Sequence, residues 1–249
     1  MHTVIAIIPS RYGSTRLPGK ALLDIGGKPL IRRVYERVAG ASLVTRVIVA
    51  TDDPRIMDAV AAFGGEAVMT SPSHRSGTER VAEAAAHFGG ELVVNVQGDE
   101  PLIEPGVVDL VIERIARDDE IACSTAASPI RDEAVWRNPN AVKVVLDLFG
   151  RALYFSRSPL PFYRDGAFGG AYLHAGIYCF RRDFLARFAA LDPTPLEQAE
   201  QLEQLRMLEH GYHIGVVVTE HASIGVDTEA DLEAVRVLVR EREGRDTAL

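Results

Sequence analysis

The first hundred residues alternate between short apolar runs and segments with helical periodicity. The runs are rich in β-branched residues and nearly continuous, which favours strands that are buried on both faces. Strands that alternate with helices at this spacing are typical of an α/β fold with a doubly wound, mainly parallel sheet. The expected strands are residues 4–8, 46–50, 66–69 and 92–96.

Helix start signals follow three of these strands. Pro29 suits the first position of a helix, and Pro54 follows Asp52 and Asp53, either of which is a favourable N-cap. Ser76 has a glutamate three residues later, which is the spacing of a capping box. Open parallel sheets bind ligands beyond the carboxyl ends of their strands, so we expect the loops at 9–20 and 97–101 to lie on the same edge.

The second half has a less regular pattern. We expect one domain over residues 1–249, with a β-rich insertion at about 130–180. Gly150 is expected to lie in the turn between antiparallel strands at 141–146 and 152–156. Prolines and glycines predict a loop at 158–170. The other expected elements are helices at 105–117 and 196–210, strands at 121–127, 172–180 and 214–218, and a last helix from Thr228.

Composition limits the classes of function. The chain has 249 residues and a formal net charge of −8, which disfavours general binding of nucleic acid. It contains no apolar stretch long enough to span a membrane, and its two cysteines, Cys123 and Cys179, do not form a disulfide framework. No charged-then-apolar leader follows Met1, so we expect a cytoplasmic protein.

Basic residues gather around the loop at 9–20, which follows the first expected strand. Residues 1–50 contain eight Lys or Arg against Asp24 and Glu36, a local balance of +6. Small residues allow backbone N–H groups to approach phosphate oxygens, and cations add charge-assisted bonds. The spacing from Gly13 to Gly19 and Lys20 fits neither a Walker loop nor a Rossmann fingerprint. We therefore predict a nucleotide-phosphate loop of another kind, with a basic surface loop as the alternative.

Two aspartates are candidate ligands for a magnesium ion. Asp99 follows the strand at 92–96, beside Gly98, and Asp227 precedes the last helix. Mg²⁺ prefers one or two carboxylates together with phosphate and water oxygens. Each aspartate also has an ordinary structural role, as a turn residue or next to a helix N-cap. Two carboxylates beside a cationic loop indicate phosphoryl or nucleotidyl transfer.

An ordered set of motifs runs from Val4 to about Arg236. The motifs are IIPSRYGSTRLPGK, IVATDD, SGTER, VNVQGDEP, NPNAVKVVLD, ALYFSRSPLP, LEQLR and GVDT. They resemble those of the 3-deoxy-manno-octulosonate (Kdo) cytidylyltransferase family, also called CMP-Kdo synthetases. The resemblance implies a magnesium-dependent, usually dimeric α/β enzyme. Such an enzyme couples CTP to Kdo, giving CMP-Kdo and pyrophosphate for lipopolysaccharide assembly. The β-rich insertion would then serve dimerisation and sugar binding.

The resemblance also implies residue roles. Arg11 and Lys20 match triphosphate-binding and catalytic positions, and Asp99 and Asp227 match catalytic positions that hold magnesium. Other positions that match the nucleotide site are Ser10, Ser14, Ser76, Gly77, Thr78 and Gln97. Positions that match the site of the acidic sugar are Arg16, Arg80, Arg157, His174, Tyr178, Glu203 and Gln204. Planar guanidinium groups suit a sugar carboxylate.

Several of these residues also have structural interpretations. Arg80 fits a solvated helix face, Tyr178 fits packing within a strand, and Glu203 and Gln204 fit the polar face of an amphipathic helix. The segment 162–170 departs from the family's pattern. The resemblance, together with the basic loop and the two aspartates, implies an in-line attack of the anomeric C2 hydroxyl of Kdo on the α-phosphate of CTP, aided by magnesium. The alternatives are a cytidylyltransferase for another acidic 2-keto sugar, such as sialic acid or an amino analogue of Kdo, and a non-catalytic nucleotide-binding regulator.

Overall fold

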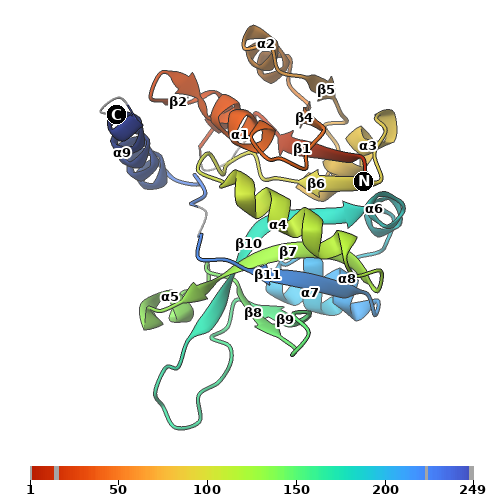
Figure 1. Cartoon of the computed structure of the whole chain (residues 1–249), viewed down its shortest axis with the longest axis vertical. Helices are drawn as coiled ribbons and strands as arrows, with labels where there is room; N and C mark the ends of the chain where they lie inside the picture. Colours follow the sequence, from red (N-terminus) through yellow and green to blue (C-terminus); the bar gives the residue numbers. More distant parts are fainter. Residues whose placement is uncertain (1, 14–16, 222–223, 247–249) are drawn as a thin grey trace. The chain divides into compact units, whose positions relative to one another are not determined.

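The computed structural model describes residues 2–13, 17–221 and 224–246 (Figure 1). Its internal contacts define two compact units, one formed by Met1–Val108 with Ser223–Leu249 and the other by Asp109–Ala222. The assignment of the whole chain to a single domain with an insertion at about 130–180 stays a prediction. Within the described residues, no helix is both long enough and apolar enough to cross a membrane.

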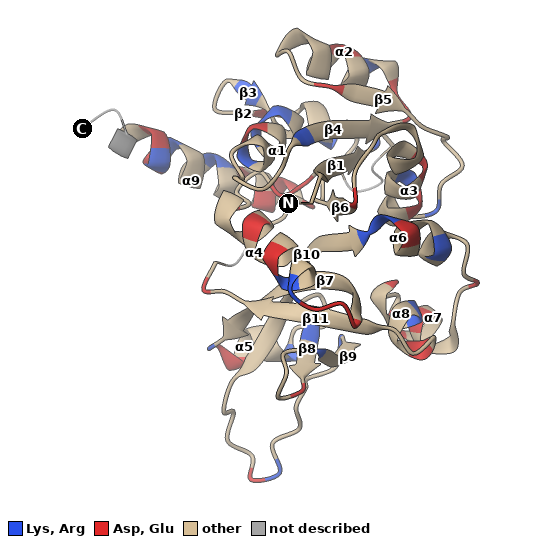
Figure 2. Ribbon diagram, turned by 45° about the vertical axis from the view of Figure 1, so that its right-hand side comes forward, with Lys and Arg blue, Asp and Glu red and all other residues tan. Residues whose placement is uncertain are grey.

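The first unit contains a parallel sheet with the strand order β6-β1-β4-β5. These strands are Val4–Ser10 (β1), Arg46–Thr51 (β4), Ala67–Met69 (β5) and Leu92–Asn95 (β6). Strands β1 and β6 carry no charged residue, are drawn entirely in tan in Figure 2, and are almost completely buried. The chain moves outward from β1 to β4 and β5 and then returns to pair β6 with the other edge of β1. This reversal confirms the expected doubly wound arrangement.

Helices α2 and α3 of the first unit begin where the sequence signals indicate. Asp53 accepts a hydrogen bond from the N–H of Arg55 at the start of α2, and Ser76 accepts one from the N–H of Glu79 at the start of α3. Pro29 is the N-cap of α1 and not its first residue. The helices are Leu30–Ala39 (α1), Pro54–Ala62 (α2), Gly77–His87 (α3) and Glu229–Asp246 (α9), with a 3-10 turn at Lys20–Leu22 and a small hairpin of Asp24–Ile25 (β2) and Lys28–Pro29 (β3).

The second unit contains a mixed sheet. Strand β7 pairs in parallel with β11 and antiparallel with β10, which pairs with β8, and β8 pairs with β9. The expected antiparallel pair around Gly150 is confirmed as β8 and β9. The strands are Ile121–Ile130 (β7), Lys143–Leu146 (β8), Ala152–Ser156 (β9), Ala171–Arg181 (β10) and His213–Val218 (β11). Helix α4 (Pro105–Ala116) begins in the first unit and ends in the second, which also contains Glu133–Arg137 (α5) and Arg182–Ala189 (α6).

The single helix expected at 196–210 is wrong. The structure has two short helices, Pro195–Glu200 (α7) and Gln204–Glu209 (α8), separated at Gln201, whose φ of +54° is left-handed. The carbonyl oxygens of Glu200 and Gln201 accept hydrogen bonds from the side chain of Arg157. A continuous helix would need these carbonyls for its own backbone hydrogen bonds. Because the competing bonds come from Arg157, which is distant in sequence, the periodic pattern did not predict the break.

Candidate functional site

The polar residues of the first unit gather where the winding of its sheet reverses. Strands β1 and β6 are parallel neighbours, so their carboxyl ends lie at the same edge of the sheet. The loop that begins after Ser10 and the loop that carries Gln97 and Asp99 leave from these two ends. In doubly wound sheets this position opens a crevice that binds ligands. The prediction that the two loops share one edge is confirmed.

A glycine allows the two loops to come this close. A Cβ atom added to Gly98 would lie 2.7 Å from the backbone oxygen of Pro9, a distance that real Cβ atoms essentially never show. Only glycine therefore fits at position 98 without displacing the backbone. Gly19 has a left-handed φ of +68° and donates its N–H to the carbonyl of Tyr12 over 3.0 Å. This bond closes the basic loop just before Lys20.

Lys20 joins the two aspartates that were predicted as metal ligands. Its Nζ lies 2.7 Å from Oδ2 of Asp99 and 3.2 Å from Oδ1 of Asp227, and it also donates to the carbonyl of Val226 over 3.1 Å. The N–H of Val226 donates in turn to the carbonyl of Asp99 over 2.9 Å. Residues 207 positions apart are thereby brought into one cluster. The two carboxylates and one ammonium leave a formal charge of −1.

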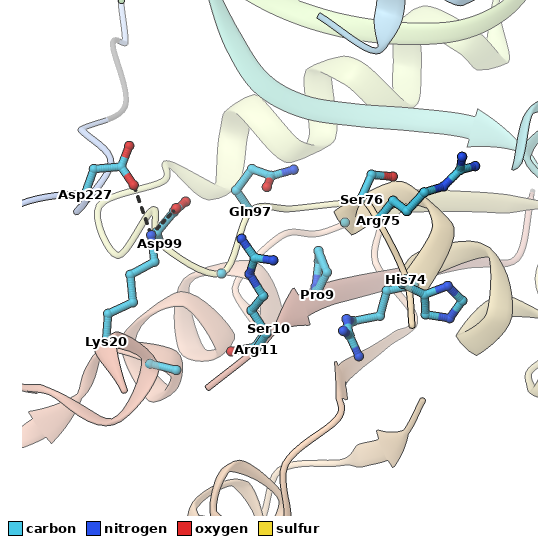
Figure 3. Close-up of a pocket in the computed structure, with 14 residues that line it drawn as sticks. Pro9, Ser10, Arg11, Lys20, His74, Arg75, Ser76, Gln97, Asp99 and Asp227 are labelled. Atoms are coloured by element: carbon cyan, nitrogen blue, oxygen red, sulfur yellow. Dashed lines mark hydrogen bonds and ion pairs between the residues drawn. The ribbon is translucent and has the colours of Figure 1, made fainter. Parts of the chain in front are cut away.

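A cavity of about 380 Å³ opens beside this cluster. Figure 3 shows Lys20, Asp99 and Asp227 at one side, Arg11 and Gln97 between, and His74, Arg75 and Ser76 at the other side. Arg11, Lys20 and Arg75 place positive groups along the cavity. The lining residues are Pro9, Ser10, Arg11, Lys20, Ala21, His74, Arg75, Ser76, Gly77, Arg80, Gln97, Gly98, Asp99 and Asp227. An elongated polar cavity with cations along it suits a polyanionic ligand.

A row of buried amide and hydroxyl groups lies behind Gln97. Asn95 is fully buried at the end of β6 and donates to Oγ1 of Thr78 over 3.2 Å, while Gln97 Nε2 lies 3.5 Å from Asn95 Oδ1. The amide of Gln97 thereby meets Asn95, which is held in turn by Thr78. The sequence analysis identified Gln97 and Thr78 and missed Asn95. The signal that could have identified Asn95 is its place as the one polar residue at the end of the apolar run Leu92–Asn95.

The sequence analysis also missed His74 and Arg75, which line the cavity from the loop before α3. Two glutamates of α3 hold this loop. Glu83 accepts bonds from the N–H of Ser71 and from His74, and these bonds lower the pKa of Glu83. Glu79 accepts the N–H of Arg75 over 2.8 Å and also pairs with its guanidinium. The loop that carries Ser76 to the cavity is therefore fixed by its own helix.

Arg80 lines the same cavity but is almost completely buried. Its guanidinium donates to Oδ2 of Asp52 over 2.8 Å and to Oγ1 of Thr70 over 2.5 Å. The alternative interpretation of Arg80 as a solvated helix residue is wrong, because 4% of its surface is exposed. Its contact with a sugar carboxylate stays a prediction. Asp52 and Thr70 were not recognised as its partners, since neither is near it in sequence.

The second unit holds the other residues that were matched to the sugar site. His174 Nε2 lies 3.0 Å from Oγ1 of Thr125, and burial lowers the pKa of His174 to about 3, so its ring is neutral at pH 7. The ring centroid of Tyr178 is 5.4 Å from that of His174. Burial, and then the charge of Glu203, raise the pKa of Tyr178. Gln204 is buried at the start of α8. These four residues therefore contribute neutral polar groups and one carboxylate.

Arg157 follows β9 and is held by backbone oxygens. Its guanidinium donates to the carbonyls of Glu200 over 2.8 Å, Pro139 over 3.2 Å and Gln201 over 3.4 Å. Ser14 and Arg16, which were predicted to bind nucleotide and sugar, lie outside the described residues. The roles assigned to individual residues at both sites stay predictions.

The Lys20 cluster fits a magnesium ion by the chemistry of its donors. Asp99 and Asp227 supply two carboxylates, which is the number of protein ligands that Mg²⁺ takes when phosphates complete its shell. The formal charge of −1 that remains beside Lys20 favours a cation. Among the described residues, no group of three or more His, Cys, Asp or Glu side chains could hold a metal by itself. A metal at this site would therefore need oxygen ligands from a substrate or from water.

Comparison with known proteins gives one consistent match. A family model described as "Cytidylyltransferase" matches residues 5–216. A protein of Geotalea uraniireducens (strain Rf4) named 3-deoxy-manno-octulosonate cytidylyltransferase is 55% identical over 243 residues, which cover 93% of this chain and 97% of that protein. A protein of Geobacter sulfurreducens with the same name is 55% identical over 93% of this chain and 97% of its own length.

A solved structure has the same fold over nearly the whole chain. It is a CMP:2-keto-3-deoxy-manno-octonic acid synthetase complexed with CTP, and it is 44% identical with a TM-score of 0.93. The match covers 96% of this chain and 99% of that one. The matches in sequence and in structure therefore cover nearly all of this chain and nearly all of each matched chain.

Proposed function

We propose a function from the premise that this chain belongs to the 3-deoxy-manno-octulosonate cytidylyltransferase family. It transfers CMP from CTP to the anomeric hydroxyl of Kdo and releases pyrophosphate. The observation that carries this function is the Lys20–Asp99–Asp227 cluster, which lies beside a cavity lined by cations. The same chemistry would supply an activated sugar for lipopolysaccharide assembly.

CTP would lie along the cavity of the first unit. Lys20 and Arg11 would bind the triphosphate, because both line the cavity at its cationic part. Ser76, Gly77 and Gln97 would meet the cytosine and ribose. Asn95 would hold the Gln97 amide and is itself bound to Thr78. Glu79 and Glu83 would keep the loop of His74 and Arg75 in place around the nucleoside.

The reaction needs no nucleophile from the protein. The oxygen of the C2 hydroxyl of Kdo forms a bond to the α-phosphorus of CTP, and the bond from that phosphorus to the bridging oxygen of the β-phosphate breaks. The hydroxyl proton is released to solvent, and pyrophosphate leaves with the electron pair of the broken bond. Lys20 and Arg11 would neutralise charge on the phosphate oxygens as it develops.

We propose that Asp99 and Asp227 hold Mg²⁺. When bound, the ion supplies positive charge that lowers the pKa of the attacking hydroxyl and stabilises the leaving group. Lys20 lies between these carboxylates and keeps them at a common position when no ion is bound. The ammonium and the carboxylates therefore act as one preorganised set of charges.

The acidic sugar would be recognised by arginines and by neutral polar groups. Arg80 and Arg157 would meet its carboxylate, and His174, Tyr178, Glu203 and Gln204 would meet its hydroxyl groups. His174 suits hydrogen bonding to a hydroxyl, because a pKa of about 3 keeps its imidazole uncharged at neutral pH.

We also propose that the enzyme is a homodimer and acts in the cytoplasm.

A turnover assay tests this function. Pyrophosphate release would be measured with CTP and a panel of 2-keto sugar acids, namely Kdo, 8-amino-Kdo and N-acetylneuraminate, with and without Mg²⁺. We expect release with Kdo only in the presence of Mg²⁺. A preference for another sugar would move the assignment to that substrate, and CTP binding by calorimetry without any product would support a non-catalytic regulator.

A further inference from the structure

Lys143 is a fully buried lysine in the segment Asn138 to Lys143, to which the proposed function gives no role. It is one of three lysines in the chain, with Lys20 at the cavity and Lys28 on the surface of the first unit. Its Nζ donates to the carbonyls of Asn138 over 2.9 Å, Ala141 over 2.5 Å and Arg157 over 2.7 Å. All three N–H donors of the ammonium are therefore used by backbone oxygens.

Glu200 binds Ser156 and Arg157, next to the Arg157 carbonyl that Lys143 binds. Its Oε1 accepts the hydroxyl of Ser156 over 2.5 Å, and its Oε2 accepts the N–H of Arg157 over 2.9 Å. The N–H of Arg157 is thus bound by a carboxylate and its carbonyl by an ammonium. The peptide groups on both sides of the Arg157 Cα are fixed by charged side chains.

The guanidinium of Arg157 binds the segments that these two residues fix. Pro139 lies between the two loop carbonyls that Lys143 binds, and Glu200 and Gln201 supply the other two acceptors. A guanidinium has five N–H donors, so three bonds to carbonyls leave two for a ligand. The direction of those two donors is set by the positions of the three carbonyls.

The ammonium of Lys143 carries a desolvation cost as well as three hydrogen bonds. Removing a charge from water is costly, and burial lowers the pKa of Lys143 while the charge of Glu200 opposes this effect. An apolar side chain of similar length would avoid that cost but would leave the three carbonyls without this donor. The ammonium instead gathers three carbonyls around one point, which an apolar side chain cannot do.

We propose that Lys143 and Glu200 are positioning residues that set the direction of the Arg157 guanidinium, and through it the affinity for the carboxylate of the acidic sugar. This inference rests on the proposed function, because Arg157 is assigned there to the sugar. It deepens that function by adding residues that do not touch the substrate.

Steady-state kinetics of matched variants test the proposal. Lys143→Met and Glu200→Gln would be compared with Lys28→Met, which removes a lysine from the Glu36 pair on the first unit. We expect Lys143→Met to raise the KM for Kdo by about tenfold or more, the size of one lost hydrogen bond to a charged group. The KM for CTP should change less than about twofold by the same scale. Lys28→Met should change neither constant.

A double-mutant cycle separates positioning from a general structural role. If Lys143 acts through Arg157, Lys143→Met should add little to the KM for Kdo once Arg157→Ala is present. Equal effects of Lys143→Met in both backgrounds would overturn the proposal, as would a parallel rise in the KM for CTP. Should Lys143→Met fail to fold, the same cycle with Glu200→Gln decides the question.

The outcomes also distinguish this inference from the proposed function. Wild-type protein that releases no pyrophosphate from CTP and any of the three sugars would refute the proposed function itself. Wild-type activity together with an unchanged KM for Kdo in both Lys143→Met and Glu200→Gln would refute only the positioning role.

Discussion

The Lys20 ammonium lies 2.7 Å from the Asp99 carboxylate and joins the loop after β1 to the loop after β6. Both residues lie at the carboxyl edge of adjacent parallel strands. The ion pair is partly exposed, with 18% of the Lys20 side chain and 28% of the Asp99 side chain accessible. Small ligands can therefore reach both partners without unfolding of the site.

Replacing the carboxylate tests whether Asp99 is needed for chemistry. Asp99→Asn keeps the shape of the side chain and removes its charge, so we expect kcat to fall by about 10³-fold, the loss of several kcal/mol of charge stabilisation. Asp58→Asn, on the exposed face of α2, is the matched control and should retain full activity. Near-normal kcat of Asp99→Asn at saturating Mg²⁺ would show that the assigned role is wrong.

The close approach of the two loops predicts that a methyl group added at position 98 lowers the free energy of unfolding. Gly98→Ala places a Cβ against the carbonyl of Pro9, so we expect the free energy of unfolding to fall by about 1–3 kcal/mol and activity to decrease with it. Gly106→Ala, in the first turn of α4, meets no atom within 4 Å and should be neutral or stabilising by up to about 1 kcal/mol. Urea unfolding of both variants measures the difference, and equal effects would contradict the prediction.

Because Gln201 has a left-handed backbone conformation, we expect substitution by glycine to change the free energy of unfolding in opposite directions at positions 201 and 198. Gln201→Gly relieves the positive φ and should stabilise the protein by roughly 0.5–1 kcal/mol. Gln198→Gly, inside α7, should destabilise it by a similar amount, because glycine lowers helix stability. Denaturant midpoints at constant slope report both changes. Destabilisation by Gln201→Gly would mean that its side-chain bond to Gln198 outweighs the backbone strain.

The low pKa of His174 predicts how stability depends on pH. The folded pKa is about 3 and the unfolded value is 6.5, so between these values the unfolded chain binds the proton more readily. The contribution of His174 to the free energy of unfolding is therefore complete above pH 6.5 and is lost as the pH falls toward 3. Relative to His174→Asn, wild type should lose up to about 2 kcal/mol between pH 7 and pH 5. A difference that does not depend on pH would contradict a ring that stays neutral in the folded protein.

The sequence by itself determined the fold class and the sheet edge at which the candidate site lies. Continuous β-branched runs specify buried parallel strands, and the caps at Asp53 and Ser76 act within three residues, so local sequence was sufficient to predict them. The loop at 9–20 and Asp99 each follow a predicted strand, and the carboxyl ends of parallel strands share one sheet edge, so the shared edge could be predicted. The pairing of β1 with β6, which makes the two loops neighbours, came from the structure.

Only the tertiary structure decided which distant residues act together. Several contacts join residues from separate elements. Asp227 pairs with Lys20, and Arg80 binds Asp52 and Thr70. Lys143 and Glu200 bind the backbone of Arg157. The break between α7 and α8 has the same origin, because Arg157 takes the carbonyls that a longer helix would use. Periodicity and capping describe bonds within a few residues of chain, whereas these contacts form only after the strands have brought their loops together.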